Sequence, residues 1–285
     1  MMKRNHDAAE LIWDAPFPLL RMHGSGCSSF LHGQTSARVD GCSDGDLIQA
    51  CWLNATGRVQ ALLEIRLTTD GADVLVLSGE IDRVASGFDR VIFPADQVRL
   101  GEQGQQRRMQ RLQAGKAPEL NQVVWLDANA DPPPSWTDRS PCNPAELECW
   151  RNKQGWPLGH QELTGDTNPF ELGLSRWVDL NKGCYLGQET VAKLASRGGV
   201  KQELRCWQST AEGCLDLESG DQLSLNDSRA GLITSVCKDN ATGDCFGLAF
   251  VRRQALDAET LLAGTSGVEV SISRPSAFCE PPSRG

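Results

Sequence analysis

One cysteine lies in a stretch of sequence that could make its sulfur reactive. Cys184 stands between two glycines in N-K-G-C-Y-L-G-Q-E, residues 181–189, and residues 188–196 have the pattern of a helix. The glycines allow tight turns around the sulfur. Free amide N–H groups at the start of a helix and the positive charge of Lys182 would both favour the thiolate, which is the nucleophilic and metal-binding form of cysteine.

Tyr185, the one tyrosine of the chain, follows this cysteine directly. It can present an aromatic face and a hydroxyl group at the same opening. The alternative for Cys184 is a buried structural residue in a turn, which is the expected role for most of the eleven cysteines. The motif therefore gives a candidate site that the rest of the chain must position.

The composition is that of an ordinary globular protein. With 285 residues, 40% of them hydrophobic and 23% charged, the chain can form two or three compact units. The net charge of −9 argues against a dedicated nucleic-acid-binding surface, because phosphate contacts need clustered lysines and arginines.

The N-terminal sequence M-M-K-R-N-H-D-A-A-E has two basic residues with no long apolar run behind them. We therefore expect neither a signal peptide nor a membrane helix, and a cytoplasmic location. The eleven cysteines are odd in number and scattered, unlike a secreted disulfide framework. Without a C-x-x-C pair, and with four dispersed histidines, the sequence shows no metal-ligand spacing, so we expect no resident metal site.

The N-terminal part predicts a sheet with helices. Residues 11–21 suit an extended strand, and a short helix follows with Ser25 as its cap and Gly33 at its end. Residues 46–67 read as two strands joined by a tight turn at Gly57, with a third strand at 73–77 and a helical period over 79–92. This order predicts an α+β unit with an antiparallel sheet.

The sequence pattern changes twice in the later part of the chain. Residues 101–118 are polar without a clear apolar face, which predicts an exposed loop or a poorly packed helix. A strand at 122–127 and a proline-rich connection then precede a helix over 143–151, with Asn143 as its cap. Beyond Gly199, five short alternating segments predict a small barrel or sandwich.

The stretch K-G-C-Y-L-G-Q-E resembles the K-G-C-Y-x-G-Q-E signature of the YgfZ-type folate-binding proteins. These are relatives of the glycine-cleavage T-protein (GcvT, an aminomethyltransferase) and are linked to iron–sulfur cluster assembly or repair and to tRNA modification. Residues 23–36, 151–163 and the G-L-I-T-S and G-L-A-F-V-R-R runs resemble the same family. The resemblance therefore covers nearly the whole chain.

This resemblance implies a fold and its division into domains. The fold is the α+β aminomethyltransferase fold, with antiparallel sheets and helices, plus a C-terminal β-barrel. We expect residues 1–200 to form the folate-binding region from two interleaved α+β subdomains. The barrel would occupy residues 201–278, and residues 279–285 would be a disordered tail.

The resemblance also implies folate ligands. N-P-F-E-L-G-L, residues 168–174, resembles T-P-x-E-A-G-L of the T-protein, whose glutamate holds the pterin end of the folate. A carboxylate can accept the two adjacent N–H donors of a 2-amino-4-oxopyrimidine edge, so Glu171 is the candidate pterin ligand. The alternative is that Glu171 caps a short turn. The other implied ligands of tetrahydrofolate or a derivative come from the motif: Lys182, Tyr185, Gln188 and Glu189.

One segment departs from the T-protein pattern. L-N-A-T-G-R-V-Q-A-L-L resembles L-N-x-x-G-G-x-x-D-D-L, in which an acidic residue assists aminomethyl transfer. Ala61 and Leu62 stand at the two aspartate positions, and neither can hold a proton. Glu64, three residues after Ala61, should face the opposite side of the strand. The resemblance therefore predicts a retained scaffold without the original chemistry.

These inferences predict a monomeric, folate-binding accessory protein in iron–sulfur cluster assembly or repair, with an effect on tRNA modification. Its partners would be folate and iron–sulfur client or assembly proteins, and Cys184 would be the catalytic residue. The thiolate could ligate iron, form a mixed disulfide or attack a one-carbon adduct. The alternatives are a folate-dependent aminomethyl or one-carbon transferase, and an interaction module whose cavity is vestigial.

Overall fold

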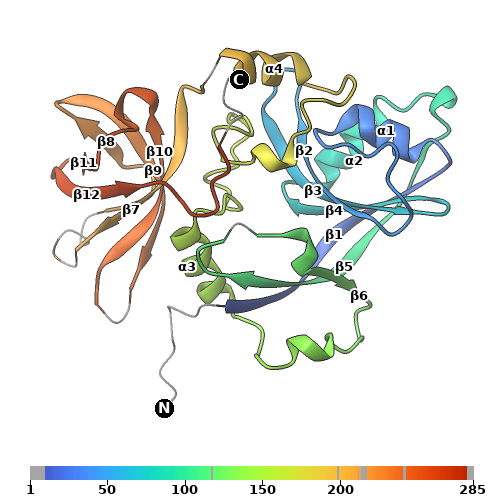
Figure 1. Cartoon of the computed structure of the whole chain (residues 1–285), viewed down its shortest axis with the longest axis horizontal. Coiled ribbons are helices and arrows are strands. Elements are labelled where there is room, and N and C mark those ends of the chain that lie inside the picture. The colour runs from blue at the N-terminus through green and yellow to red at the C-terminus, as the bar shows by residue number, and fades with distance from the viewer. Residues whose placement is uncertain are drawn as a thin grey trace.

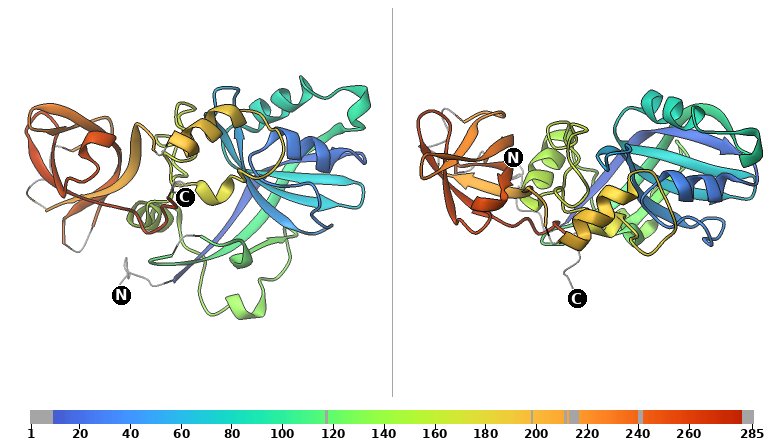
Figure 2. Two further views of the ribbon diagram at one scale, coloured as in Figure 1. Left: turned by 45° about the horizontal axis from the view of Figure 1, so that its top comes forward. Right: turned by 90° about the horizontal axis from the view of Figure 1, so that it is seen from above.

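Two β structures dominate the computed structural model, which describes residues 10–280 apart from 117, 198, 211, 213–216, 240 and 241. One is a six-stranded antiparallel sheet, and the other is a closed barrel (Figure 1). A middle segment with the helix α3 (Pro144–Gln154) lies between them, and the turned views show the same separation (Figure 2). This arrangement confirms the α+β fold with a C-terminal barrel.

The sheet has the strand order β2-β3-β4-β1-β5-β6. The three strands predicted at residues 46–77 form its hairpin and the strand beside it, and the long β1 lies next to them. The strands are β1 (Glu10–His23), β2 (Leu47–Leu53), β3 (Val59–Thr68), β4 (Gly71–Ser78), β5 (Arg99–Gln113) and β6 (Val123–Leu126).

The prediction of a loop or poorly packed helix over residues 101–118 is wrong. This region contains β5, which pairs with β1 from Glu10↔Gln113 to His23↔Arg99. Its inward-facing positions include Arg108 and Gln110, both fully buried. Because polar side chains occupy the inner face, the strand lacks the apolar alternation by which strands are recognised.

The helices α1 (Cys27–Gln34) and α2 (Ile81–Asp89) share an apolar cluster with one face of the sheet. Phe30 and Phe88 meet there edge to face, with ring centroids 5.5 Å apart. The expected limits of α1 are wrong, because its N-cap is Gly26 and Gly33 lies within the helix. By contrast, Asn143 caps α3 as predicted and accepts the Glu146 N–H at 3.0 Å.

The opposite face of the sheet forms a larger core that joins the parts of the molecule. It brings together Leu62 and Leu75 of the sheet, Tyr185 of the motif, and Leu204 and Phe250 of the barrel. Val191 of α4 (Gln188–Arg197) enters the same core. The cysteine motif is therefore built onto the core where the sheet and the barrel meet.

The barrel closes in the order β10-β7-β12-β11-β8-β9. All five segments predicted beyond Gly199 form strands, and β11 is the strand that the sequence did not predict. The barrel strands are β7 (Gln202–Ser209), β8 (Gln222–Leu225), β9 (Ser228–Lys238), β10 (Cys245–Arg252), β11 (Thr260–Ala263) and β12 (Val268–Ser273). Short 3-10 turns occur at Pro94–Asp96, Leu120–Gln122, Pro134–Trp136, Ser175–Trp177 and Arg253–Ala255.

Residue 279, where the disordered tail was expected to begin, is held by the middle segment. The Cys279 N–H donates to the Gly173 carbonyl at 2.8 Å, and the Ser175 hydroxyl donates to the Cys279 carbonyl at 3.0 Å. Residues 281–285 of the expected tail lie outside the described residues. Among the helices that the structure describes, none is long and apolar enough to cross a membrane.

Candidate functional site

Two glycine turns bring the cysteine motif against the β2–β3 hairpin. Gly57 has φ +72° and Gly187 has φ +82°, whereas Gly183 does not take a positive φ. A Cβ atom on Gly187 would lie 2.6 Å from the Asn54 carbonyl oxygen and 3.0 Å from the Gly57 Cα. The two turns can touch only because both positions are glycine.

The hairpin turn is itself fixed by a side chain. The Asn54 amide oxygen accepts the backbone N–H groups of Thr56 and Arg58, both at 3.0 Å. At the next residue, the Val59 N–H donates to the Thr167 carbonyl at 2.8 Å. The turn that resembles the T-protein stretch thus connects directly to the segment that leads to Glu171.

Glu171 is fully buried, and only one of its two carboxylate oxygens has partners within the part of the chain that the structure describes. Its Oε2 accepts the Asn168 N–H at 3.0 Å and contacts the Arg58 guanidinium at 3.4 Å, while its Oε1 has no hydrogen-bond partner among the residues that the structure describes. Burial raises the pKa of this carboxyl, although the Asn168 N–H and Arg58 oppose the shift. Glu171 therefore caps the short turn that begins at Asn168, as the alternative reading expected, and its second carboxylate oxygen stays without a donor in the described ranges.

Lys182 is directed into the molecule. Its ammonium donates to the carbonyls of His32, Thr35 (2.6 Å) and Ala37 (2.7 Å), at and beyond the end of α1, and lies 4.8 Å from the centroid of the Tyr185 ring. Carbonyls at a helix C-terminus lack donors within the helix, and a lysine ammonium can donate hydrogen bonds to them. Burial lowers the pKa of Lys182 to about 8, so it stays mainly protonated at neutral pH.

This arrangement corrects two expectations for Lys182. Its three N–H groups are used by backbone carbonyls, so the structure gives it a structural contact where the sequence predicted a folate contact. Its charge is buried beneath α1 and is not directed to the surface where Cys184 lies.

Further hydrogen bonds attach the motif and the residues before it to α1 and the residues after it. The Leu186 N–H donates to the Gly33 carbonyl at 3.2 Å, and the Asp179 N–H donates to the Ser36 carbonyl at 2.9 Å. The Ser36 hydroxyl in turn donates to the Trp177 carbonyl at 2.6 Å. The position of the cysteine loop is therefore set by the segment around the C-terminal end of α1.

The other predicted folate ligands point in different directions. Tyr185 is buried in the larger core with a hydroxyl that has no partner, and burial raises its pKa well above the usual range. The Gln188 amide donates to the Lys182 carbonyl at 3.5 Å, while the exposed Glu189 pairs with Lys193. The expectation that Tyr185 lies at an opening is wrong, and these side chains do not surround one opening.

Cys184 is exposed to solvent. Every other free cysteine in the described ranges is buried or half-buried. Helix α4 begins four residues later, at Gln188, so the sulfur lies in the loop before the helix and not in its first turn. The loop is held on both sides of Cys184, by Lys182 and Gly187, and presents an accessible thiol.

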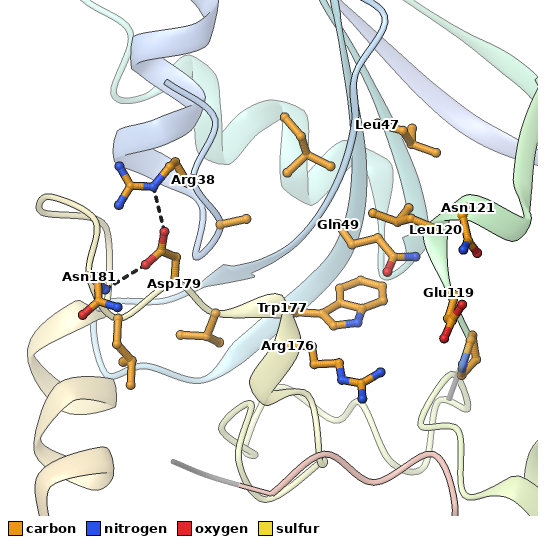
Figure 3. A pocket seen from close by; sticks show the side chains of 15 residues that line it. Arg38, Leu47, Gln49, Glu119, Leu120, Asn121, Arg176, Trp177, Asp179 and Asn181 are labelled. Carbon is orange, nitrogen blue, oxygen red and sulfur yellow. Dashed lines mark hydrogen bonds and ion pairs between the residues drawn. The ribbon is translucent and has the colours of Figure 1, made fainter. Parts of the chain in front are cut away.

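A cavity of about 980 Å³ opens beside the start of the motif (Figure 3). Residues of β2, of the 118–121 segment and of the 176–181 segment form its walls. Arg38 and Asp179 pair at 2.9 Å on one side, and the 119–121 segment lies on the other (Figure 3). Trp177, Arg176 and Gln49 lie between them (Figure 3). Its size suits a small organic ligand. Neither Glu171 nor Cys184 is among its lining residues.

The positions of the missing aspartates are apolar and closed. Ala61 is 1% exposed and Leu62 is 0% exposed, and they belong to opposite faces of the sheet. The nearby Glu64 is also fully buried, where Arg108 contacts both of its oxygens at 2.7 Å and holds its pKa below the usual value although burial would raise it. This carboxylate is therefore committed to an ion pair.

Sequence reasoning missed two chemically notable residues. Arg108 lies in the region that was expected to be a loop, so its pairing with Glu64 was not predicted. Cys149 in α3 contacts Cys237 of β9, and this hydrogen bond lowers the pKa of Cys149 to about 7. Lys153, one helical turn after Cys149, is the signal that could have indicated it.

No family model matches the sequence. It is 34% identical over 115 residues to a chloroplastic protein of Arabidopsis thaliana whose name is "putative transferase", which is 40% of this chain and 26% of that protein. It is 31% identical over 64 residues to an aminomethyltransferase of Acidobacterium capsulatum, which is 22% of this chain and 17% of that enzyme. The matched regions thus span about a quarter or less of these relatives.

The whole fold has a solved counterpart. The structure is similar to that of the glycine cleavage system aminomethyltransferase T of Bartonella henselae, with a TM-score of 0.68 and 14% sequence identity. The similarity covers 98% of this chain and 88% of the other. The chain therefore has the fold of aminomethyltransferase T, with sequence similarity to transferases in part of its length.

Proposed function

We propose that this chain is a folate-binding accessory protein of the YgfZ type, which acts in iron–sulfur cluster assembly or repair and affects tRNA modification. The observation that carries the proposal is the half-used carboxylate of Glu171. It lies where the hairpin turn, through Arg58, meets the 167–171 segment, and its Oε1 is buried without a partner among the described residues. A buried charged oxygen without donors is costly, and a ligand with N–H groups would supply them.

The surroundings of Glu171 suit a folate. Phe170 and Leu172 on either side of it belong to the larger core, and so does Tyr185, whose hydroxyl also has no partner. A pterin offers N–H donors for Glu171 and a flat surface for aromatic and aliphatic side chains. When bound, tetrahydrofolate supplies a reduced pteridine that carries one-carbon groups. The protein's part is to orient the pterin through Glu171.

Cys184 supplies the second part of the proposed function. Its thiol is exposed on a loop whose backbone is fixed by Lys182 and Gly187. An exposed cysteine in a fixed loop can reach the surface of another protein, and a thiolate is a ligand for iron and a nucleophile for disulfides. We therefore assign client contact to Cys184 and folate binding to Glu171.

An aminomethyl or one-carbon transferase is the second candidate. The sequence similarity to the Acidobacterium capsulatum aminomethyltransferase favours it. Against it, Ala61 and Leu62 carry no acid and Glu64 is held by Arg108, so no carboxylate of β3 is free to move a proton. General acid–base assistance is typically worth about 10²–10⁴-fold in rate. Robust aminomethyl transfer from a lipoyl carrier to tetrahydrofolate would favour this candidate over the accessory protein.

The first test is calorimetric titration of the purified chain with tetrahydrofolate and its one-carbon derivatives. We expect saturable binding of one folate per chain, and absence of binding would overturn the proposal. The second test expresses Cys184→Ser in a strain that lacks the protein. We expect unchanged folate binding and loss of activity in iron–sulfur enzymes, because serine fills a similar space but is not a soft metal ligand. Full rescue by Cys184→Ser would remove Cys184 from the function.

A further inference from the structure

Two cysteines meet at the interface between α3 and the barrel. Cys149 lies on α3 one helical turn before Asn152, and α3 packs on β9, the strand that carries Cys237. The same interface is fixed by Asn152, whose amide N–H donates to the Cys237 sulfur at 3.3 Å and whose amide oxygen accepts the Ser235 hydroxyl. The two thiols are thus brought together by tertiary structure, from segments far apart in the sequence.

The two thiols differ in accessibility. Cys149 is half-buried and can be reached by a small molecule, whereas Cys237 is 9% exposed. A small oxidant can therefore meet Cys149 first, and Cys237 can then react with Cys149 without leaving the interface. This is the arrangement of an attacking thiol and a resolving thiol.

The charges around the pair give the two thiols different acidities. The hydrogen bond from Cys237, helped by Lys153, lowers the pKa of Cys149 to about 7, against the opposing effects of burial, Glu148 and Asp239. The same contact raises the pKa of Cys237, with only Arg151 opposing. Cys149 is therefore the thiol that forms a thiolate more readily, while Cys237 keeps its proton.

A third cysteine at this interface provides a contrast. The Cys206 sulfur contacts the carbonyls of Asn152 at 3.5 Å and Lys153 at 3.7 Å, and burial raises its pKa to about 12. It shares the location but has no thiol partner among its hydrogen bonds. Cys206 is therefore a matched control for the pair.

We propose that Cys149 and Cys237 form a redox-active dithiol, which a low-molecular-weight disulfide such as glutathione disulfide oxidises to a bond between α3 and the barrel. The Cys149 thiolate attacks one sulfur of glutathione disulfide and expels one glutathione thiolate, which leaves a mixed disulfide. Cys237 then gives up its proton, attacks the Cys149 sulfur and expels the second glutathione. Two protein thiols are oxidised and one disulfide is reduced to two thiols, and a dithiol reductant reverses the reaction.

The consequence of oxidation is a covalent link between two parts that otherwise meet by packing. Helix α3 packs on β7, β9 and β10, and the Leu204 N–H of β7 donates to the Glu171 carbonyl at 2.8 Å. Oxidation would therefore fix the barrel next to the Glu171 segment. The proposal itself does not depend on folate binding.

The test incubates the full chain in glutathione buffers of increasing oxidised fraction, followed by acid quenching, alkylation and non-reducing peptide mapping. We expect a linked Cys149–Cys237 peptide that disappears with dithiothreitol. Cys237→Ser should instead trap glutathione on Cys149, and Cys206→Ser should leave the linked peptide unchanged. Circular dichroism checks that each variant is folded.

Two results would overturn the proposal. One is that Cys149 and Cys237 stay reduced in folded protein under conditions in which Cys184 becomes glutathionylated. The other is a linked peptide that forms only after denaturant is added. As an independent measurement, the alkylation rate of Cys149 should rise with a midpoint below the pKa of an ordinary thiol, and Cys237→Ala should move this midpoint upward, because the hydrogen bond is lost.

Discussion

Glu64 and Glu171 are both fully buried carboxylates, and they differ in how many donors surround them. Glu64 accepts four hydrogen bonds, two from Arg108 and one each from Gln49 and Trp125. Glu171 has its contacts on Oε2 alone. A buried carboxylate whose two oxygens both accept hydrogen bonds has a structural role. A buried carboxylate with an unpaired oxygen can accept a hydrogen bond from a ligand.

The difference also appears in the direction of the pKa shifts. Arg108 lowers the pKa of Glu64, so this residue contributes stability that is present above its unfolded pKa and is lost as the pH falls. Burial raises the pKa of Glu171, so the folded state holds its proton more tightly, and stability is lost as the pH rises through that pKa. The two residues therefore respond to pH with opposite sign.

The largest effect is expected for Glu64→Gln. It leaves the fully buried Arg108 without its counter-charge, which typically costs about 3–5 kcal/mol. Urea unfolding of wild type and variant measures the change. The matched control is Glu102→Gln on the exposed side of β5, expected within about 0.5 kcal/mol of wild type. A cost for Glu64→Gln no larger than that of the control would show that the pair is dispensable.

Glu171→Gln tests the other side of the comparison. It keeps the shape but removes the charge, so folate binding should weaken by about 1.5–3 kcal/mol, or roughly 10–150-fold. The free energy of unfolding should change by less than about 1 kcal/mol, because only one neutral and one partly exposed donor are affected. Calorimetry measures the first quantity and urea unfolding the second. Unchanged folate affinity would remove Glu171 from the site.

Lys182→Met extends the comparison to a buried cation. Methionine keeps the apolar stem but leaves three carbonyls around the end of α1 without their donor, and we expect a loss of about 1–3 kcal/mol. Lys193→Met, at an exposed position of α4, is the control. Folate affinity should be retained if Lys182 is structural, and a loss of affinity without a loss of stability would restore it as a ligand.

The smallest effect concerns pH. Glutamine does not titrate, so comparison of wild type with each variant between pH 4 and pH 7 isolates the carboxylate. The stability advantage of wild type over Glu64→Gln should grow as the pH rises. The stability of wild type relative to Glu171→Gln should instead decrease as the pH rises. If both differences change in the same direction, the contrast between the two environments is wrong.

The sequence predicted the elements whose side chains follow a simple rule. The β2–β3 hairpin at Gly57 and the capped start of α3 at Asn143 were expected from local signals alone. The strand β5 could not be predicted, because its inner face carries Arg108 and Gln110, and a buried arginine is explained only by Glu64 on another strand. The alternation of apolar residues along a chain predicts which apolar side chains are buried. It does not predict a buried ion pair between two strands.

The candidate site shows the same limit. The motif located the exposed Cys184, but proximity in sequence suggested that Lys182 would lie beside it. The structure directs the lysine to carbonyls near α1, which are distant in sequence. In the same way, the contact between Cys149 and Cys237 depends on how α3 packs against the barrel, and no local pattern encodes it.

The attachment of Lys182 to the carbonyls near α1 has a consequence for synthesis on the ribosome. The bonded residues are separated by 145 to 150 positions. At about 5–20 residues per second, the end of α1 therefore waits roughly 7–30 s for its donor after it is made. During this interval the N-terminal half must persist with those carbonyls hydrated. The cysteine loop can therefore stabilise the end of α1 only late in synthesis. Nascent chains halted before residue 182 should be more sensitive to protease near α1 than finished chains.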